Sequence, residues 1–392
     1  MATNERLNIL MVDPWGIRGP GMYTYSLCSE LHALCHLTLI TNCYYEFEKQ
    51  SQFTIKKLFF RISERLPDSF GGRKLIRGVE YLLGLIILLG QIWRHRLDVV
   101  HFQWLLFYPL DTLFLKVLVP ICKHYKVKLV LTVHDVIPHV SGELYIPQLK
   151  KIYPQFDQLI VHTSTLKAQL CNLFGDTVNE SNIAVIPHGN YDLIDSVIDN
   201  QRVLTLQDQF SLFHQIERYS RVFLFIGTIH RSKGLDLLLH AWDKAELSNA
   251  ILLIVGQPKY DFLDKVKAMH KTNIGLDLGY KSNEEMKAYY SLADVILLPY
   301  LEASQSGVLY SSLSYSLPVI ATDVGEFKAI ITEDIGWIVP PNNVADLSSV
   351  LCRVNKTEKE ELIQKGIKAK AVSEKFSWQT IADTTLSTVY QK

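Results

Sequence analysis

Residues 298–320 read LPYLEASQSGVLYSSLSYSLPVI, which has the pattern of a strand end, a turn, a helix and the next strand. The apolar run ends at Pro299, and the turn carries one carboxylate, Glu302, followed by small residues. Parallel sheets are wound from strand–helix–strand units, and their ligands bind at the carboxyl ends of the strands. The stretch therefore predicts a doubly wound α/β sheet with a ligand near Glu302.

Short apolar runs separated by helical segments occur in two sets along the chain. Between the sets, residues 195–221 are charged and rich in glutamine and contain no strong strand pattern. Two sets of buried strands predict two similar domains that face a central cleft, each with its own parallel sheet. The runs before residue 188 are LNILMVD, LTLIT, DVVHFQ, KLVLTVH, QLIVHT and IAVIP, and those after the break are VFLFIG, ILLIVG, IGLDLG, DVILLP, PVIAT and GWIVP.

The composition is that of an ordinary folded protein. Of 392 residues, 48% are hydrophobic and 20% are charged, and this length suits two or three domains. Forty basic residues balance forty acidic ones, so no overall charge points to a nucleic-acid partner. The six cysteines form no CxxC pair and the chain shows no signal peptide, so we expect reduced thiols and a cytoplasmic protein.

The most apolar run is YLLGLIILLGQIW at residues 81–93. As a helix it would span about 20 Å, less than the roughly 30 Å of a bilayer core, so a buried or half-buried helix is one interpretation. The other is contact with the inner face of the plasma membrane, because basic residues flank the run. Residues 54–66 (TIKKLFFRISERL) also have the pattern of a basic, amphipathic helix, which suits an anionic membrane surface.

The first strand runs into a glycine-rich turn that lets the backbone approach a ligand, and we expect a helix to begin at Met22 or Tyr23. The spacing is GxxGxG, so a tight structural turn is the alternative. A dehydrogenase would need an acid at the end of the second strand, where Thr41 and Asn42 stand. The glycines are Gly16, Gly19 and Gly21.

Three histidines follow or end strands of the first half. His134 stands in LTVHDVIPH, where an imidazole at the sheet edge can bind a sugar hydroxyl or a developing oxyanion. His101 ends the neighbouring strand, and His188 lies in the loop at 186–191 (IPHGNY). A packed histidine is the alternative for each, most of all for His101.

In the second half, two segments suit a diphosphate. The strand VFLFIG ends at Gly227 and leads to Arg231 and Lys233, whose charges would neutralise phosphates beside a helix N-terminus. Backbone N–H groups of residues 306–309 begin another expected helix and can hold phosphate oxygens without a side chain. An ordinary basic loop is the alternative for the first segment.

These motifs resemble the retaining glycosyltransferases of family 4. The resemblance covers essentially the whole chain. It implies a GT-B fold, with domains at 1–200 and 218–375 and a C-terminal helix (376–392) that crosses back, and transfer of a sugar from a nucleoside diphosphate sugar with retention. The motifs are the first glycine turn, TVHD, IPHG, FIGTIHRSKGLD, SLADVILLPYLEASQSGVLYSSLSYSLPVIATDVGE and FSWQTIAD.

The resemblance implies a role for each matching residue. His134 would contact the transferred sugar, Lys233 the diphosphate and Glu302 the sugar hydroxyls, with Arg231 completing the catalytic set. His101 and His188 would lie on the acceptor side. The expected donor-binding residues are Gly19, Gly21, Gly227, Arg231, Lys233, Gly279, Tyr280, Lys281, Glu302, Ser306, Gly307, Val308, Leu309 and Tyr310.

The chain departs from the family pattern in two places. Tyr310 stands where many relatives carry a glutamate that binds the ribose, so it either inherits that contact or belongs to the helix core. The cation that usually accompanies the lysine is displaced to Arg231. No DxD triplet occurs, so we expect no metal and no cofactor.

The best guess for the donor is UDP-glucose, and for the acceptor a lipid-linked sugar or a polysaccharide. Without an obvious carboxylate nucleophile, we expect the acceptor to attack on the face from which the diphosphate leaves. One alternative is a sugar-nucleotide epimerase or hydrolase of the same architecture. Another is a sugar-nucleotide binding protein without catalysis.

Overall fold

The structure is a computed structural model that describes residues 6–67, 69–94, 96–138, 142–190, 221–269, 271–303 and 306–391. It divides into two compact units. Unit 1 comprises Met1–Gly189 and Trp378–Lys392, and unit 2 comprises Asn190–Ser377. The predicted boundaries at residues 200 and 218, and most of the glutamine-rich stretch, lie outside the described residues.

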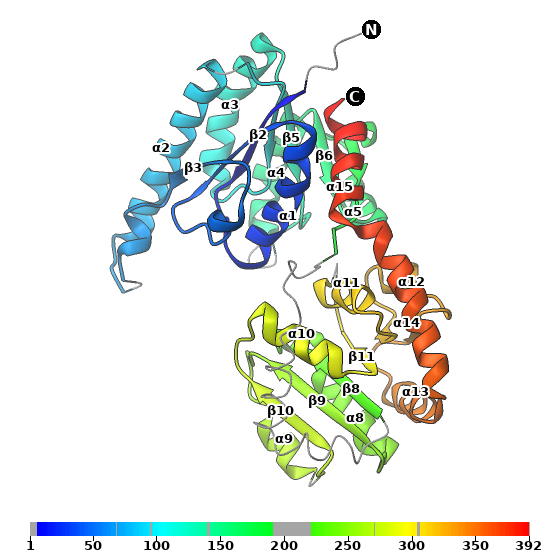
Figure 1. Cartoon of the computed structure of the whole chain (residues 1–392). Helices are drawn as coiled ribbons and strands as arrows, with labels where there is room; N and C mark the ends of the chain where they lie inside the picture. Colours follow the sequence, from blue (N-terminus) through cyan, green and yellow to red (C-terminus); the bar gives the residue numbers. More distant parts are fainter. Residues whose placement is uncertain are drawn as a thin grey trace. The chain divides into compact units, whose positions relative to one another are not determined.

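Unit 1 is built on a seven-stranded sheet with the order β3-β2-β1-β4-β5-β6-β7 (Figure 1). Its strand pairings are all parallel, so the carboxyl ends of the strands lie at one edge. The strands are β1 (Asn8–Asp13), β2 (His36–Asn42), β3 (Thr54–Phe59), β4 (Val99–Phe102), β5 (Lys128–Thr132), β6 (Gln158–Val161) and β7 (Ile183–Val185).

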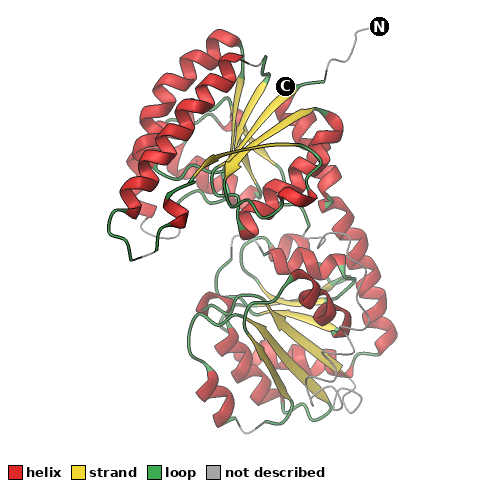
Figure 2. Ribbon diagram, turned by 60° about the vertical axis from the view of Figure 1, so that its left-hand side comes forward, coloured by secondary structure: helices red, strands yellow, loops and turns green. Residues whose placement is uncertain are grey.

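Helices cover both faces of this sheet (Figure 2). The C-terminal segment closes unit 1, because α15 packs against α1 and continues into a π-helical turn at Leu386–Tyr390. The α-helices of the unit are α1 (Arg18–Leu34), α2 (Arg73–Arg94), α3 (Tyr108–Tyr125), α4 (Ile146–Ile152), α5 (Ser164–Phe174) and α15 (Trp378–Thr385).

Two local predictions for unit 1 are wrong. Helix α1 begins at Arg18 and not at Met22 or Tyr23, because Pro20 and the glycines are tolerated in a first turn, where no N–H is needed. Residues 54–66 form strand β3 and a 3₁₀ turn instead of a helix. Pairing with β2 and burial of Phe59 beneath α2 outweigh the helical pattern.

Helix α2 is longer than the apolar run that predicted it. It has 22 residues, and by length and composition alone it is the one described helix that could cross a membrane. One face packs on the sheet: Tyr81, Leu85 and Leu88 are fully buried, and a side chain at Gly84 would collide with Phe59. Only 28% of its most apolar window is buried, so the other face stays exposed.

Unit 2 repeats the arrangement with a six-stranded parallel sheet in the order β10-β9-β8-β11-β12-β13. Alternate residues of its strands enter two separate cores, as Phe223 and Leu224 of β8 show. The strands are β8 (Arg221–Ile226), β9 (Ala250–Gly256), β10 (Ile274–Leu278), β11 (Val295–Leu298), β12 (Val319–Thr322) and β13 (Gly336–Val339). The helices are α8 (Leu235–Ala245), α9 (Leu263–Ala268), α10 (Asn283–Leu292), α11 (Gly307–Ser314), α12 (Phe327–Ile330), α13 (Val344–Lys356) and α14 (Lys359–Ser373).

Candidate active site

The glycine turn after β1 is held by a buried carboxylate. Asp13 accepts hydrogen bonds from the backbone N–H groups of Trp15 (3.0 Å) and Gly16 (2.9 Å) and from the Thr24 hydroxyl (2.6 Å). Burial raises the pKa of Asp13 to about 6, while these hydrogen bonds act to lower it. The role of Asp13 is therefore to shape the turn.

The three glycines of this turn differ in what they allow. Gly16 has a φ of +56°. Gly21 packs against the backbone of Gly16, because a Cβ at Gly21 would lie 2.7 Å from Gly16 O. Gly19 faces open space, with no atom within 4 Å of an added Cβ. Gly16 and Gly21 are thus required by packing, and Gly19 is the glycine of this turn that leaves room beside the backbone.

Four histidines meet in unit 1 at the carboxyl ends of β4, β5 and β6 and in the loop after β7, and we call them the histidine cluster. Tyr23 packs against three of these rings with centroids 4.8–5.2 Å apart. The indole of Trp104 stacks on His134 at 4.3 Å, with the two planes 7° apart. The members of the cluster are His101, His134, His162 and His188.

The histidine cluster is neutral. Burial lowers the pKa of His101 and His162 to about 3 and that of His188 to about 4. The pKa of His134 lies well below its usual value, because burial and then the neighbouring imidazoles disfavour its charged form. Each ring therefore has one nitrogen that donates and one that accepts.

The predicted members of this cluster differ in which ring atoms are available. His101 is fully buried, and its nitrogens contact Thr132 Oγ1 (2.8 Å) and Tyr390 OH (2.6 Å). Neither ring nitrogen is therefore left to bind the acceptor substrate. His188 contacts its neighbouring carbonyl, Gly189 O, at 2.7 Å. His134 Nε2 is buried without a hydrogen-bond partner among the described residues.

In unit 2, glycines end three adjacent strands, β8, β9 and β10. Their φ angles are +119° at Gly227, +132° at Gly256 and +135° at Gly279, a region that other residues rarely adopt. A Cβ at Gly256 would lie 1.9 Å from Gly227 O, so the strand ends are closely packed. The backbone of these three strand ends therefore carries no side chain of its own.

The turn that carries Lys233 is fastened to the end of β11. Gly234 has a φ of +69°, and a Cβ there would lie 1.8 Å from Pro299 O. From the other side, the N–H groups of Leu301 (2.8 Å) and Glu302 (3.5 Å) point to Ser232 O. The packing thus places the turn that carries Lys233 next to the backbone of Glu302, although the two residues are far apart in the sequence.

Lys233 is a half-buried ammonium group for which no carboxylate partner is found among the described residues. Burial lowers its pKa to about 8. Its Nζ lies 3.8 Å from the centre of the Tyr300 ring, a cation–π contact that offsets part of the lost hydration. Such a site favours an anion, because a phosphate would restore the missing counter-charge.

The other predicted charges of unit 2 are more exposed. Arg231 lies over Tyr260 (4.7 Å) and approaches Asp236 (3.9 Å), and 69% of its side chain is exposed. Glu302 is an exposed side chain. Arg231 is therefore partly committed to contacts within unit 2, which agrees with its displaced position in the sequence.

Helix α11 begins at Gly307, within the segment 306–309 that was predicted to bind phosphate and that also contains Val308. Ser306 caps the helix, and its carbonyl (3.0 Å) and hydroxyl (3.4 Å) both contact the N–H of Leu309. Tyr310 is fully buried, and its hydroxyl donates to Glu326 Oε1 at 2.7 Å. The Tyr310 ring thus belongs to the core, and its hydroxyl faces a carboxylate that stands 16 residues later.

The loop after β10 is the segment predicted to contact the base. Lys281 pairs with Asp277 at 2.7 Å, and Tyr289 also donates to Asp277. Tyr280, between Gly279 and Lys281, is 78% exposed. The ion pair of Lys281 fixes the course of this loop and leaves the Tyr280 ring on the surface.

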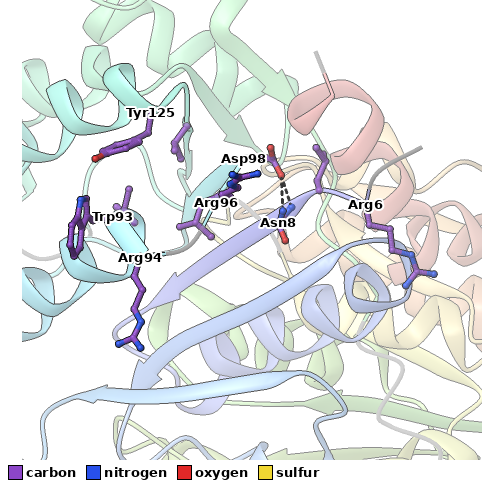
Figure 3. A pocket seen from close by; sticks show the side chains of 11 residues that line it. Arg6, Asn8, Trp93, Arg94, Arg96, Asp98 and Tyr125 are labelled. Atoms are coloured by element: carbon purple, nitrogen blue, oxygen red, sulfur yellow. Dashed lines mark hydrogen bonds between the residues drawn. The ribbon is translucent and has the colours of Figure 1, made fainter. Parts of the chain in front are cut away.

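Among the described residues, no group of three or more His, Cys, Asp or Glu side chains could hold a metal ion. A separate hollow of about 720 Å³ lies in unit 1 at the C-terminal end of α2 (Figure 3). It is lined by Arg94 and Arg96, by the aromatic rings of Trp93 and Tyr125, and by residues at the beginning of β1. No member of the histidine cluster lines this hollow.

Sequence reasoning missed His162, Trp104 and Glu326. His162 follows β6 as His134 follows β5, so its place at a strand end was a usable signal. Trp104 follows β4 in the same way and offered the same signal. Glu326 had none, because only packing brings it onto Tyr310. Tyr191, the last residue of the predicted IPHGNY loop, lies outside the described residues.

Two family profiles match the chain. The profile described as Glycosyltransferase Family 4 matches residues 17–190, and the one described as Glycosyl transferases group 1 matches residues 220–356. Together they cover most of both units. The chain belongs to glycosyltransferase family 4. The family predicted from the motifs is thereby confirmed.

Solved structures share the fold at low sequence identity. The chain is similar to Anabaena HepE, solved in complex with UDP, with a TM-score of 0.72 and 15% identity over 98% of this chain and 100% of that chain. It is also similar to the sucrose-phosphate synthase of Thermosynechococcus elongatus, with a TM-score of 0.72 and 18% identity over 98% and 99% of the chains. The predicted GT-B fold is thus confirmed.

Curated relatives match over part of their length. An uncharacterised glycosyltransferase of Methanocaldococcus jannaschii is 26% identical over 245 residues, which cover 59% of this chain and 59% of the relative. The D-inositol 3-phosphate glycosyltransferase of Streptomyces bingchenggensis is 27% identical over 176 residues, 41% of this chain and 38% of that protein. The chain thus spans between about two fifths and three fifths of the length of these relatives.

Proposed function

We propose that this family 4 glycosyltransferase transfers a sugar from a UDP-sugar to an acceptor hydroxyl. The observation that carries the proposal is Lys233, a half-buried ammonium group on a turn whose backbone is hydrogen-bonded to that of Glu302 at the carboxyl edge of a sheet. An ammonium without a carboxylate partner suits the diphosphate, and an adjacent carboxylate suits the hydroxyls of the attached sugar. The HepE structures with UDP and with UDP-glucose support this choice of donor class.

The transfer proceeds with retention and without a metal ion. The acceptor oxygen forms its bond to the anomeric carbon on the face from which the diphosphate oxygen departs. The proton of the acceptor hydroxyl passes to the departing diphosphate, whose growing negative charge is stabilised by Lys233 and, to a smaller extent, by Arg231. His134 acts on the transferred sugar, and glucose is the proposed sugar.

A thermal-shift screen of nucleotide sugars tests the donor. Binding at a concentration of 100 times Kd stabilises a protein by about 2.7 kcal/mol, which gives a measurable increase in Tm. We expect UDP-glucose to raise Tm more than ADP-glucose or GDP-mannose. Consumption of the donor in the absence of any acceptor, at the rate seen with one, would instead indicate a hydrolase or epimerase. NMR of the product's anomeric proton distinguishes retention from inversion.

We also propose that the protein works at the inner face of a membrane on a lipid-linked or polymeric acceptor. The support is an apolar row on the solvent side of α2, which we call the α2 stripe; its side chains are 37–75% exposed and recur at helical spacing. Lys74 lies at one end and the hollow with Arg94 and Arg96 at the other, a charge pattern that complements anionic lipid. The α2 stripe comprises Leu75, Val79, Leu82, Leu83, Ile86, Ile87 and Trp93.

Vesicle co-sedimentation tests the membrane proposal. We expect the protein to bind vesicles that contain phosphatidylglycerol and to bind phosphatidylcholine vesicles less. Ile86→Glu should reduce this binding about tenfold or more, because it places a charge in the buried apolar contact. Ile367→Glu is the matched control, since Ile367 is equally exposed on α14 of unit 2. A protein that fails to bind vesicles, and whose self-association is abolished by Ile86→Glu, would show that the stripe joins two copies.

A further inference from the structure

A hydrogen-bonded relay of two imidazoles leads from the backbone of unit 1 to His134. His162 Nδ1 lies 3.0 Å from the carbonyl oxygen of Ile186, and His162 Nε2 lies 3.1 Å from His134 Nδ1. A carbonyl oxygen only accepts hydrogen bonds, so the proton of His162 must be on Nδ1. His162 Nε2 then carries a lone pair and accepts.

The next step of the relay determines the tautomer of His134. Because His162 Nε2 accepts, His134 Nδ1 must carry a proton and donate it. Both rings are neutral, since burial and the proximity of other imidazoles disfavour their charged forms. Neutral His134 therefore presents an unprotonated Nε2, which is also the nitrogen that lacks a partner among the described residues.

We infer that His162 is a positioning residue that fixes His134 as a hydrogen-bond acceptor at Nε2, and that this nitrogen takes a hydroxyl of the bound sugar. The inference rests on the proposed function and deepens it. A sequence motif leaves open whether an imidazole at this place meets a hydroxyl or an oxyanion. The relay decides, because an oxyanion needs a donor and Nε2 has no proton to give.

The surroundings of the pair support this assignment. The Trp104 ring stacks on one face of His134, and Tyr23 meets its edge at 4.8 Å, so packing holds the ring plane while His162 fixes the protons. Trp104 Nε1 is a second buried polar atom without a partner among the described residues. An acceptor and a donor on stacked rings match a sugar, whose hydroxyls do both.

Two variants of His162 separate positioning from packing. His162→Gln keeps a carbonyl oxygen that can accept from His134 Nδ1, whereas His162→Leu has a similar volume and no acceptor. In ¹⁵N-histidine-labelled protein without ligand, long-range ¹H–¹⁵N spectra report which ring nitrogen is protonated, and His134→Gln identifies the His134 signals. We expect His134 to be protonated at Nδ1 in the wild type and in His162→Gln, and to gain Nε2 protonation in His162→Leu.

Turnover gives the second measurement. With UDP-glucose as the probe, His162→Leu should release UDP up to about tenfold more slowly than wild type, with KM nearly unchanged, and His162→Gln should restore most of the rate. Thermal melting checks that each variant is folded, and His124→Gln is the control, because His124 is exposed on α3 and its ring contacts Tyr125 and not the histidine cluster. An Nε2-protonated His134 in the wild type, or a tautomer unchanged in folded His162→Leu, would overturn the inference. Wild type that turns over no nucleotide sugar would instead refute the proposed function, and the spectra would still decide the relay.

Discussion

At the scale of single residues, the contrast between Lys233 and Arg231 makes the first prediction. Lys233 is half-buried and has no carboxylate partner among the described residues, while Arg231 is mostly exposed and shares Asp236 with Lys265. Lys233→Ala should weaken UDP binding by about 1.5–3 kcal/mol, the range for a hydrogen bond to a charged group, and leave uridine binding almost unchanged. Arg231→Ala should have the smaller effect.

Isothermal titration with UDP and with uridine measures both quantities. The low pKa of Lys233 adds a pH test: above pH 8 the free ammonium group loses its proton, so UDP affinity should fall in wild type and not in Lys233→Ala. A larger loss of UDP affinity in Arg231→Ala than in Lys233→Ala would show that the diphosphate is held by the other cation.

The second residue-scale prediction concerns Tyr310 and Glu326. Burial raises the pKa of Glu326 to about 7, and the Tyr310 hydroxyl opposes this shift by donating to the carboxylate. A folded-state pKa above the unfolded value means that stability is greatest at low pH and is lost as the pH rises through about 7. The wild type should therefore lose stability between pH 5 and pH 8, and Glu326→Gln should not show this loss.

Tyr310→Phe acts on the same pair. It removes the donor from a buried carboxylate, which should lower the free energy of unfolding at pH 8 by about 1–3 kcal/mol, and by less at pH 5, where Glu326 is neutral. Urea unfolding of the three proteins at both pH values measures this. UDP affinity separates the two earlier interpretations, since it should be unchanged if the Tyr310 ring is only core and reduced if its hydroxyl also binds the ribose.

At the scale of elements, the active-site turn of unit 2 depends on one glycine. Gly234 connects the Lys233 turn to α8, and its Cα approaches Pro299 O at the end of β11. Gly234→Ala would place a methyl group into that carbonyl and strain the positive φ, so the turn must move away from β11. We expect UDP affinity to fall about as much as in Lys233→Ala, and the Tm to fall as well.

The control for this variant is Gly90→Ala in α2. Nothing lies within 4 Å of a Cβ at Gly90, and alanine favours a helix by about 1 kcal/mol over glycine. This variant should keep UDP affinity and keep or raise the Tm. Wild-type UDP affinity in Gly234→Ala would mean that the contact with β11 does not position Lys233.

At the scale of the whole molecule, acid should destabilise unit 1 before unit 2. The members of the histidine cluster have pKa values below 6.5, so the unfolded chain binds protons that the folded unit does not, and stability falls as the pH drops from about 6.5 towards 4. Asp13 and Asp111, with pKa values raised to about 6 and about 7, work in the opposite direction. Because four histidines destabilise the folded unit in acid and only two carboxyl groups stabilise it, unit 1 should lose stability as the pH falls.

Unit 2 should gain stability as the pH falls, because burial of Glu326 favours its protonated form. Each unmatched proton changes stability by about 1.4 kcal/mol per pH unit. Hydrogen exchange read by mass spectrometry at pH 7 and pH 5, corrected for intrinsic rates, should show protection lost in β4, β5 and β6 and kept in β8 and β9. Equal loss in both units would contradict the assignment of neutral buried histidines.

The sequence by itself determined the framework of this protein. Every strand predicted from an apolar run is present, because fully buried parallel strands must be continuous in Val, Ile and Leu. Strand β3 was missed, since an edge strand with half-buried lysines has no such run. The motifs also identified the family and named Lys233, Glu302 and His134, because chemistry at the carboxyl end of a strand is visible as a polar residue after an apolar run.

The tertiary structure alone decided how these residues are presented. Packing of Gly234 on Pro299 places the Lys233 turn beside the backbone of Glu302, burial of Tyr310 turns its hydroxyl to Glu326, and the contact of His162 with His134 fixes a tautomer. Each of these contacts joins residues that are between 16 and 70 positions apart in the chain. Local pattern has no access to such pairs, because hydrogen bonds and burial depend on which strand ends become neighbours in the sheet.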